Sequence, residues 1–274
     1  MPELPEVETV RRGLERRVVG RTIRRLEVRE SRLRTPLVPR ALRRALLGRR
    51  IEALERRAKY LLVHLSGRQV LVIHLGMTGQ LVVERAGAPL GPHTHVRLGL
   101  EANDELRYTD ARRFGMLFVV PRRELEAHPR FAHLGPEPLG PDFTPQYLRT
   151  RARSVRKPVK SFLMDAAVVV GVGNIYATEA LHRARVHPRT PAGRLGGARW
   201  ERVHDAVRDV LVEALRAGGT TLQDFRDADG RSGDFQVQLR VYGRQGEACS
   251  RCGRRIRRIV QAGRSTFYCP GCQH

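Results

Sequence analysis

The sequence predicts an α+β protein of two domains: a strand-rich N-terminal half behind a leading helix, and a helical C-terminal half ending in a metal-binding tail. Three observations support this fold class. At 274 residues, the chain is longer than one typical domain. Strand-like segments are confined to residues 22–120, whereas helical periodicity dominates from residue 145. All four cysteines lie after residue 248.

The first element that we expect is a helix over residues 3–18. Its apolar residues recur at helical spacing from Val7 to Val18, and Pro5 stands in the first turn, where proline is tolerated. This helix would lead into the strand-rich region.

Short strands separated by turn signals, such as Ser66-Gly67 and Asn103-Asp104, are expected between residues 22 and 120. Many short strands at this spacing favour a sandwich or a barrel. The expected strands are Thr22–Val28, Tyr60–Leu65, Gln69–His74, Gln80–Val83, His95–Leu100 and Met116–Val120.

The second half begins after residues 121–145, whose proline, glycine and histidine predict a linker. Residues 218–237 hold few apolar side chains and predict a long loop, which is more often functional than structural. The expected helices are Pro145–Ala152, Val159–Val168, Asn174–Ala184 and Ala198–Ala217.

Charge indicates the class of partner. Lysine and arginine number 51 against 28 acidic residues, a net charge of +23 that favours nucleic acid over a merely solvated basic surface. Only three of the 51 are lysines: Lys59, Lys157 and Lys160. No apolar run is long enough for a membrane span, and no signal pattern opens the chain, so we expect a soluble intracellular protein.

The cysteines form two pairs, Cys249-x2-Cys252 and Cys269-x2-Cys272, separated by sixteen residues. Each pair puts two thiolates on one tight turn, and two pairs complete a tetrahedron around one structural Zn²⁺ with no open position. Four unrelated reduced thiols are the alternative. Between the pairs we expect a hairpin that carries Arg264 outward, either to a phosphate or as one more surface arginine.

Two glycines, Gly171 and Gly173, predict a tight turn between two helices, with Asn174 as the N-cap of the second. The N-terminus of such a helix can hold an anion, and Lys157 and Lys160 could flank the same phosphate. An ordinary helical hairpin explains the glycines equally well.

Three motifs resemble the bacterial formamidopyrimidine-DNA glycosylases, the MutM family. They are the opening Met1-Pro-Glu-Leu-Pro-Glu-Val-Glu, the turn Gly171-Val-Gly-Asn-Ile-Tyr and the segment Gly263-Arg-Ser-Thr-Phe-Tyr-Cys-Pro-Gly-Cys-Gln. The resemblance spans the whole chain. It implies a β-sandwich catalytic domain over residues 1–135, a helix–two-turns–helix DNA-binding domain over 136–240 and a zinc finger over 241–274. DNA would lie in a cleft between the halves with the damaged nucleotide flipped out.

The resemblance also implies a bifunctional DNA glycosylase and abasic-site lyase that removes 8-oxoguanine and formamidopyrimidines from duplex DNA in base excision repair. The implied nucleophile is the amine of Pro2, which requires removal of Met1, and the implied general acid is Glu3. Without chemistry, Pro2 is a helix-entry proline and Glu3 a first-turn carboxylate. Lys59 matches a lysine of the elimination steps, and Arg264 matches a finger arginine that grips phosphates.

DNA contacts follow from the same resemblance. Met77, Arg112 and Phe114 match residues that fill the void left by the flipped base, although each alone could be core or surface. His93, Lys160 and Asn174 are the expected backbone contacts, and the loop 218–237 matches a lesion-capping loop. The sequence departs from the family pattern at Ala111, Ala166 and Asp234.

Two other functions remain open at this point. A zinc-ribbon binding protein without catalysis explains the charge and the cysteines, but it explains neither the Pro-Glu start nor the isolated Lys59. The oxidised-pyrimidine branch, endonuclease VIII, is the rival enzyme, and the opening PELPEVE rather than PEGPE argues against it. We expect a monomer in the bacterial cytoplasm, associated with the nucleoid through duplex DNA that contains oxidised purines, with no membrane contact.

Overall fold

The computed structural model describes residues 2–220 and 238–274, and the chain divides into two compact units. The sandwich unit comprises residues 2–132 with 217–220, and the helical unit comprises residues 133–216 with 238–274. Most of the predicted loop 218–237, including Asp234, lies outside the described residues, as does Met1. In the described parts of the chain, no helix is long and apolar enough to cross a bilayer.

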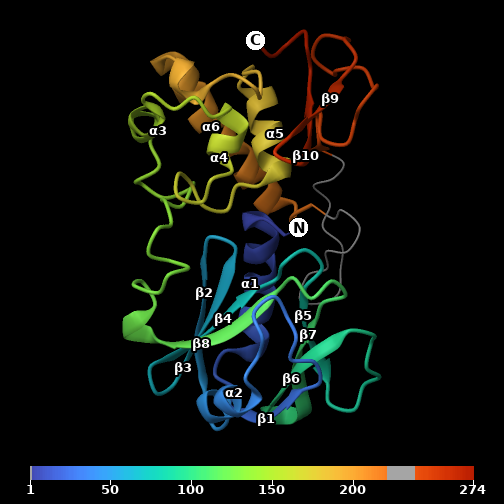
Figure 1. Ribbon diagram of the computed structural model, residues 1–274. Helices are drawn as coiled ribbons and strands as arrows, with labels where there is room; N and C mark the ends of the chain where they lie inside the picture. The colour runs from blue at the N-terminus through green and yellow to red at the C-terminus, as the bar shows by residue number, and fades with distance from the viewer. Residues whose placement is uncertain (1, 221–237) are drawn as a thin grey trace. The chain divides into compact units, whose positions relative to one another are not determined.

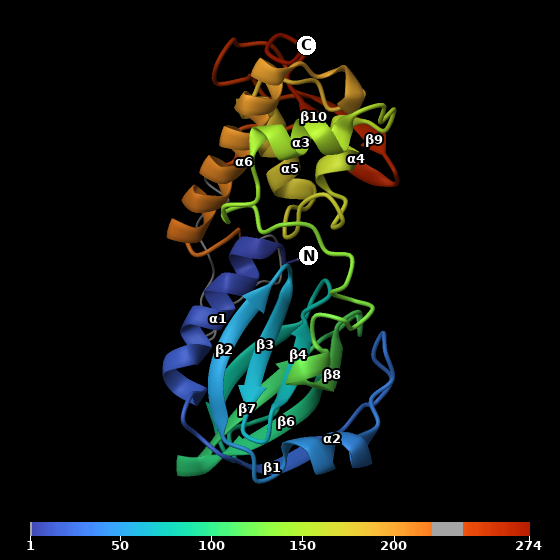
Figure 2. The same cartoon turned by 90° about the vertical axis from the view of Figure 1, so that its left-hand side faces the viewer.

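The sandwich unit consists of two antiparallel four-stranded sheets, in the orders β1-β6-β7-β5 and β2-β3-β4-β8. Figure 2 shows the second sheet in front of the first. The strands are β1 (Ile23–Val28), β2 (Ile51–Arg57), β3 (Tyr60–Leu65), β4 (Gln69–His74), β5 (Gln80–Arg85), β6 (Thr94–Leu100), β7 (Asp104–Thr109) and β8 (Met116–Pro121). The predicted sandwich is confirmed.

Two helices cover the edges of this sandwich. Helix α1 (Leu4–Val18) packs against β2 and β5, the edge strand of each sheet on one side, and α2 (Pro39–Leu46) packs against β1 and β8 on the other. Val7, Val10 and Leu14 of α1 are buried in the core, as their spacing predicts. Covering both open sides removes the exposed edges that would otherwise pair with other chains.

Strands β2 and β7 and helix α2 were not expected from the sequence. Strand β7 begins with Asp104-Glu105, which breaks the apolar alternation. Glu105 is nevertheless buried, because Arg97 (2.6 Å) and Arg107 (3.0 Å) donate to its carboxylate. A charge that is paired in this way can be buried at a position where an unpaired one would be too costly.

The helical unit contains α3 (Pro145–Ala152), α4 (Val159–Leu163), α5 (Asn174–Arg183) and α6 (Gly197–Arg216) (Figure 1). Trp200 of α6 is buried against Phe162 of α4. The described residues also form three short 3₁₀ segments: η1 (Glu101–Asn103) and η2 (Arg122–Glu124) in the sandwich unit, and η3 (Ala192–Arg194) in the helical unit.

Two predictions in this unit were wrong. The helix expected over 159–168 ends at Leu163, because Asp165 turns the chain: its side chain accepts from the nitrogen of Ala167. Asn174 is the first residue of α5 rather than its N-cap, which is Gly173.

The finger (residues 241–274) contains the expected hairpin, β9 (Arg257–Gln261) and β10 (Arg264–Tyr268). Its small core is formed by Val241, Ile256 and Phe267 with three of the cysteines. Glu179 of α5 holds the start of the finger, because its carboxylate accepts from the backbone nitrogens of residues 240–242.

Candidate active site and nucleic-acid interface

The start of α1 carries the first candidate site. Pro2 and Glu3 are buried, with Glu3 only 2% exposed at the N-cap position. The nitrogen of Glu3 donates to Glu6 Oε2 at 2.8 Å, and the nitrogen of Thr220 donates to Glu6 Oε1 at 2.7 Å. Both oxygens of Glu6 therefore accept from backbone nitrogens, which ties the chain's first residues to Thr220.

Lys59 occupies the two-residue turn between β2 and β3, next to Ala58, whose φ is 56°. It is half-buried and lies close enough to His74, at the end of β4, to affect its titration. Burial, together with the charges of Lys59, Arg34 and Arg130, lowers the pKa of His74 to about 4.

His74 is a candidate that the sequence analysis missed. Its ring lies 4.9 Å from that of Tyr60, its neighbour on β3, and its Nδ1 accepts from the nitrogen of Gly76 at 3.0 Å. The neutral ring therefore carries its proton on Nε2, where it can donate to an anion. The only sequence signal was its place directly before the Gly76-Met77 loop.

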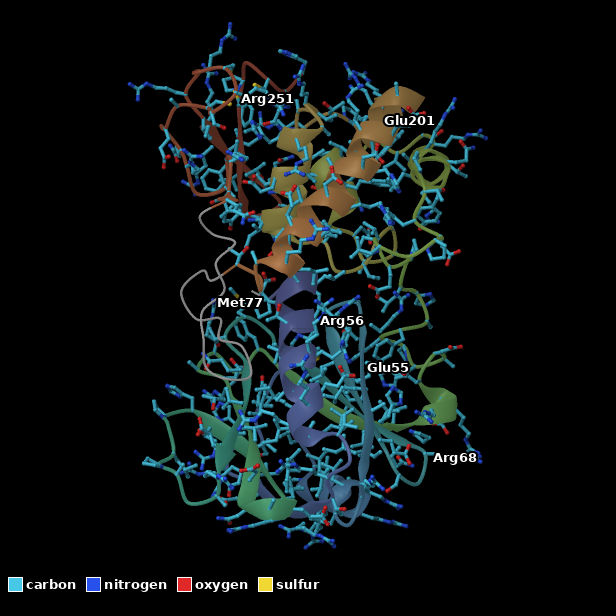
Figure 3. All side chains as sticks on the ribbon, turned by 180° about the vertical axis from the view of Figure 1, so that it is seen from behind. Glu55, Arg56, Arg68, Met77, Glu201 and Arg251 are labelled. Carbon is cyan, nitrogen blue, oxygen red and sulfur yellow. The ribbon has the colours of Figure 1, made fainter. Side chains whose placement is uncertain are left out.

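Two loops carry exposed side chains of the kind that wedge into stacked bases. Met77, labelled in Figure 3, lies between β4 and β5 and is 37% exposed. Phe114 lies between β7 and β8 and is 44% exposed, with the guanidinium of Arg112 4.7 Å above its ring. The loops touch: a Cβ on Gly76 would lie 2.5 Å from the nitrogen of Gly115.

His93 is exposed beside these loops, with a φ of 62°. Its carbonyl accepts from the nitrogen of Asp110 (3.1 Å), and the ring of His95 contacts the Asp110 carbonyl at 2.7 Å. The structure thus gathers Met77, His93, Arg112 and Phe114 around Asp110.

The helical unit holds a second cluster, centred on Lys160, which is 2% exposed. Its Nζ donates to Asn174 Oδ1 (2.5 Å), Thr266 Oγ1 (2.6 Å) and the carbonyl of Ser265 (3.4 Å). Asn174 Nδ2 also donates to the Ser265 carbonyl, at 3.1 Å. Lys160 and Asn174 therefore fasten the helices to strand β10, whose first residue is the exposed Arg264.

A cavity of about 220 Å³ adjoins this cluster, lined by Lys160, Ser161, Met164, Gln261, Ala262 and Arg264. Gln261 Oε1 is buried with no hydrogen-bond partner within residues 2–220 and 238–274. Lys160 and Arg264 place two cations on the wall of this cavity, where they suit an anionic ligand. Lys157 pairs instead with Asp165, at 2.9 Å.

The four cysteines meet in the finger. Their Sγ atoms all lie within 4.8 Å of one another, and Cys249, Cys269 and Cys272 are buried. Four thiolates at this separation form a closed tetrahedral site for one structural zinc ion, as expected from their spacing. His182 Nε2 lies 3.6 Å from Cys249 Sγ, where an imidazole can orient the ligand.

A β-sandwich with a buried Pro-Glu start, an arginine-rich helical unit and a zinc finger together define a DNA-repair enzyme. Family models agree along the chain: the formamidopyrimidine-DNA glycosylase N-terminal domain matches residues 1–117, that family's H2TH domain matches 134–226, and a zinc finger found in FPG and IleRS matches 246–274. The chain belongs to the formamidopyrimidine-DNA glycosylase family.

Individual relatives match over their full length. The formamidopyrimidine-DNA glycosylase of Alkalilimnicola ehrlichii is 53% identical over 100% of both chains, and that of Thioalkalivibrio sulfidiphilus is 50% identical over the same share. The protein is thus similar to bacterial DNA glycosylases along its whole length. This similarity argues against the alternative of a zinc-ribbon binding protein without catalysis.

Solved structures agree. The MutM (FPG) protein of Thermus thermophilus has a TM-score of 0.89 and 44% identity, covering 99% of this chain and 98% of that one. Lactococcus lactis Fpg in complex with DNA that contains an abasic site has a TM-score of 0.93 and 36% identity, covering 99% of each chain. The same enzyme with N7-benzyl-Fapy-dG DNA has a TM-score of 0.93, with 36% identity and all of both chains covered.

Proposed function

We propose that this glycosylase is bifunctional: it removes 8-oxoguanine and formamidopyrimidines from duplex DNA and then cuts the strand at the abasic site. The observation that carries the proposal is the buried Pro2-Glu3 start, fixed by Glu6. Complexes of the related Lactococcus lactis Fpg with DNA that contains N7-benzyl-Fapy-dG or an abasic site support the substrate class.

The first step uses the amine of Pro2, after removal of Met1. An α-amino group has a pKa near 8 in model peptides, so an appreciable fraction is neutral at pH 7. Its lone pair attacks the sugar C1′, and the bond to the damaged base breaks with its electron pair on the base, which takes up the proton that the amine loses. Glu3 donates a proton to O4′ as the ring opens. Because proline is a secondary amine, the product is an iminium cation.

The iminium acts as an electron sink for strand cleavage. It acidifies the C2′ proton, and loss of that proton expels the 3′ phosphate by β-elimination. A second elimination expels the 5′ phosphate, so one covalent intermediate serves base removal and both strand cuts. Lys59 supports these steps through a phosphate contact, and the Nε2–H of His74 is a second donor beside it.

The remaining site residues grip the DNA. Arg264 and Asn174 bind the phosphates beside the lesion, and Lys160 holds Asn174 and β10 in place for them. Met77, Phe114 and Arg112 fill the space left by the flipped nucleotide, with Arg112 donating to the orphaned base. His93 contacts the backbone. We further propose that the enzyme acts as a monomer in the bacterial cytoplasm.

The decisive experiment is borohydride trapping on a duplex with 8-oxoguanine opposite cytosine, followed by mass spectrometry of the N-terminal peptide. We expect an adduct on Pro2. Pro2→Gly should slow strand cleavage by roughly tenfold or more while leaving DNA affinity largely intact, since it alters the nucleophile and no DNA contact.

Full strand cleavage by Pro2→Gly, or no adduct from protein shown to lack Met1, would refute the nucleophile assignment. Thymine glycol in place of 8-oxoguanine tests the rival pyrimidine branch, because faster cleavage of that lesion would reverse the substrate class.

A further inference from the structure

Asp110, which the proposed mechanism does not use, is fully buried between the two loops that carry the void-filling side chains. Its Oδ1 accepts from the hydroxyl of Thr78 at 2.5 Å. Its Oδ2 accepts from the nitrogen of Gly115 at 2.8 Å and from the hydroxyl of Tyr108 at 2.9 Å. One carboxylate thus holds both ends of the loop 110–115 and the neighbouring loop 75–79.

Thr78 extends this connection to Arg112. Its Oγ1, while donating to Asp110, accepts from the backbone nitrogen of Arg112 at 3.1 Å. Thr78 directly follows Met77, and Arg112 stacks on Phe114. A single hydroxyl therefore joins the loop that carries Met77 to the loop that carries the other two side chains.

The chemistry of Asp110 suits this role better than that of an amide. All three groups facing its carboxylate are donors, so an asparagine would turn its own NH₂ toward at least one of them. Burial and the charge of Asp110 both raise the pKa of Tyr108, which keeps its hydroxyl protonated as a donor.

We propose that Thr78 and Asp110 are positioning residues that lock Met77, Arg112 and Phe114 into one rigid unit, and that this lock sets the enzyme's preference for the base opposite the lesion. The inference rests on the proposed void-filling function of these three side chains. Discrimination by hydrogen bonds needs donors at fixed positions, because a guanidinium that can shift finds acceptors on a wrong base as well.

The test compares Thr78→Val, which keeps the shape and removes the hydroxyl, with Thr78→Ser, which keeps the hydroxyl. Single-turnover cleavage of 8-oxoguanine opposite cytosine and opposite adenine gives a rate ratio for each protein. We expect Thr78→Val to lower the cytosine preference by roughly tenfold, the scale of one base-edge contact, and Thr78→Ser to retain it. Thr35→Val, which removes a hydroxyl bonded to Arg130 in the same unit, is the matched control and should keep the ratio.

Hydrogen exchange tests whether the two loops are held together, independently of whether the protein cleaves DNA. The amide of Arg112 should exchange faster in Thr78→Val than in wild type or Thr78→Ser, whether or not the protein cleaves the chosen lesion. An unchanged Arg112 amide in Thr78→Val would overturn the lock, and an unchanged cytosine preference would overturn its role in base discrimination. If the wild type fails to cleave 8-oxoguanine while Arg112 exchange behaves as expected, the proposed function is wrong and the lock stands.

Discussion

At the scale of single residues, the site depends on buried polar groups whose partners come from the backbone. Glu6 illustrates this, since its carboxylate accepts from the nitrogen of nearby Glu3 and from that of Thr220, which lies 214 residues further along the chain than Glu6. A buried acceptor that lost either donor would keep its desolvation cost without compensation. Glu6 therefore holds the backbone directly after the proposed nucleophile.

His74 yields a prediction about pH. Its pKa is about 4 in the fold, against about 6.5 in an unfolded chain, so between these values the unfolded state binds more protons. Stability contributed by neutral His74 is complete above about pH 6.5 and is lost as the pH falls toward about 4, by up to about 3 kcal/mol. The positive charges that face His74, those of Lys59, Arg34 and Arg130, all lower its pKa.

The measurement is the urea midpoint, followed by far-ultraviolet circular dichroism, at pH 7 and at pH 4.5. His74→Gln should reduce the difference between the two midpoints, because it removes the group that must be protonated. The exposed His133, changed to glutamine, serves as the control and should leave the difference as in wild type. An equal pH dependence in His74→Gln and wild type would contradict the prediction.

At the scale of elements, periodicity located the segments that bury one clear apolar face. Helix α1 was expected nearly to the residue, because its apolar side chains mark one buried face. Strands β3 and β4 were expected because each is a short, mostly apolar run between turn signals, and both are buried on their two faces. Strand β7 was missed, because Glu105 and Arg107 look solvent-exposed in sequence and are buried only through their mutual pairing. A charged residue that is buried with a partner looks the same in the sequence as one that faces solvent, so the pairing leaves no signal.

The residues of the candidate site also fall into two groups, those that the sequence predicts and those that it does not. The exposed Met77 and Phe114 could be expected from turn-like neighbours, and the zinc ligands from their spacing. The supporting residues could not: Thr78 and Asp110 become important only when two loops 32 residues apart meet through one hydrogen bond. Asn174 was expected to cap a helix, yet its side chain instead accepts from Lys160.

Zinc removal tests the finger as an element. Its core holds few apolar residues, so folding depends on the metal, which contributes about 10–16 kcal/mol in isolated zinc-finger peptides. A chelator should therefore disorder the hairpin β9–β10 and displace Arg264, weakening DNA binding, while most of the helical circular dichroism remains. Hydrogen exchange in β10 and DNA titration report the two effects.

Adding Zn²⁺ back should restore both readouts together, which serves as the control for chelator damage. Metal analysis shows whether the zinc has been removed. If the amides of β10 remain protected from hydrogen exchange after that removal, packing alone supports the hairpin. Loss of DNA affinity without loss of that protection would point to a different role for the metal.

At the scale of the whole molecule, the dominant property is a net charge of +23. Arginine supplies nearly all of it, and its planar guanidinium stays protonated and binds phosphate oxygens in pairs. Such a surface attracts any duplex, damaged or not, so affinity and lesion recognition must come from different residues. In the proposed mechanism, the buried start of α1 and the lock between the two loops provide recognition, and the arginines that contact phosphates provide affinity.

This division predicts the salt dependence of binding. Each neutralised phosphate releases counterions, so the logarithm of the affinity should fall linearly with that of salt concentration, with a slope of about −0.9 per contact. Six to ten contacts would weaken binding by roughly 10³ to 10⁵ between 50 and 200 mM salt. Fluorescence anisotropy with lesion-containing and undamaged duplexes should give similar slopes and different intercepts, because recognition adds a salt-independent offset.

Substitution of single arginines localises the contacts. Arg264→Ala should reduce the slope by about one on both duplexes, whereas Arg25→Ala, on the edge strand β1 where Arg25 pairs with Glu27, should leave it unchanged. A salt-insensitive dissociation constant would refute backbone binding altogether. Equal slope changes for Arg264→Ala and Arg25→Ala would mean that the arginines act through net charge alone, since only a specific contact distinguishes two residues of identical charge.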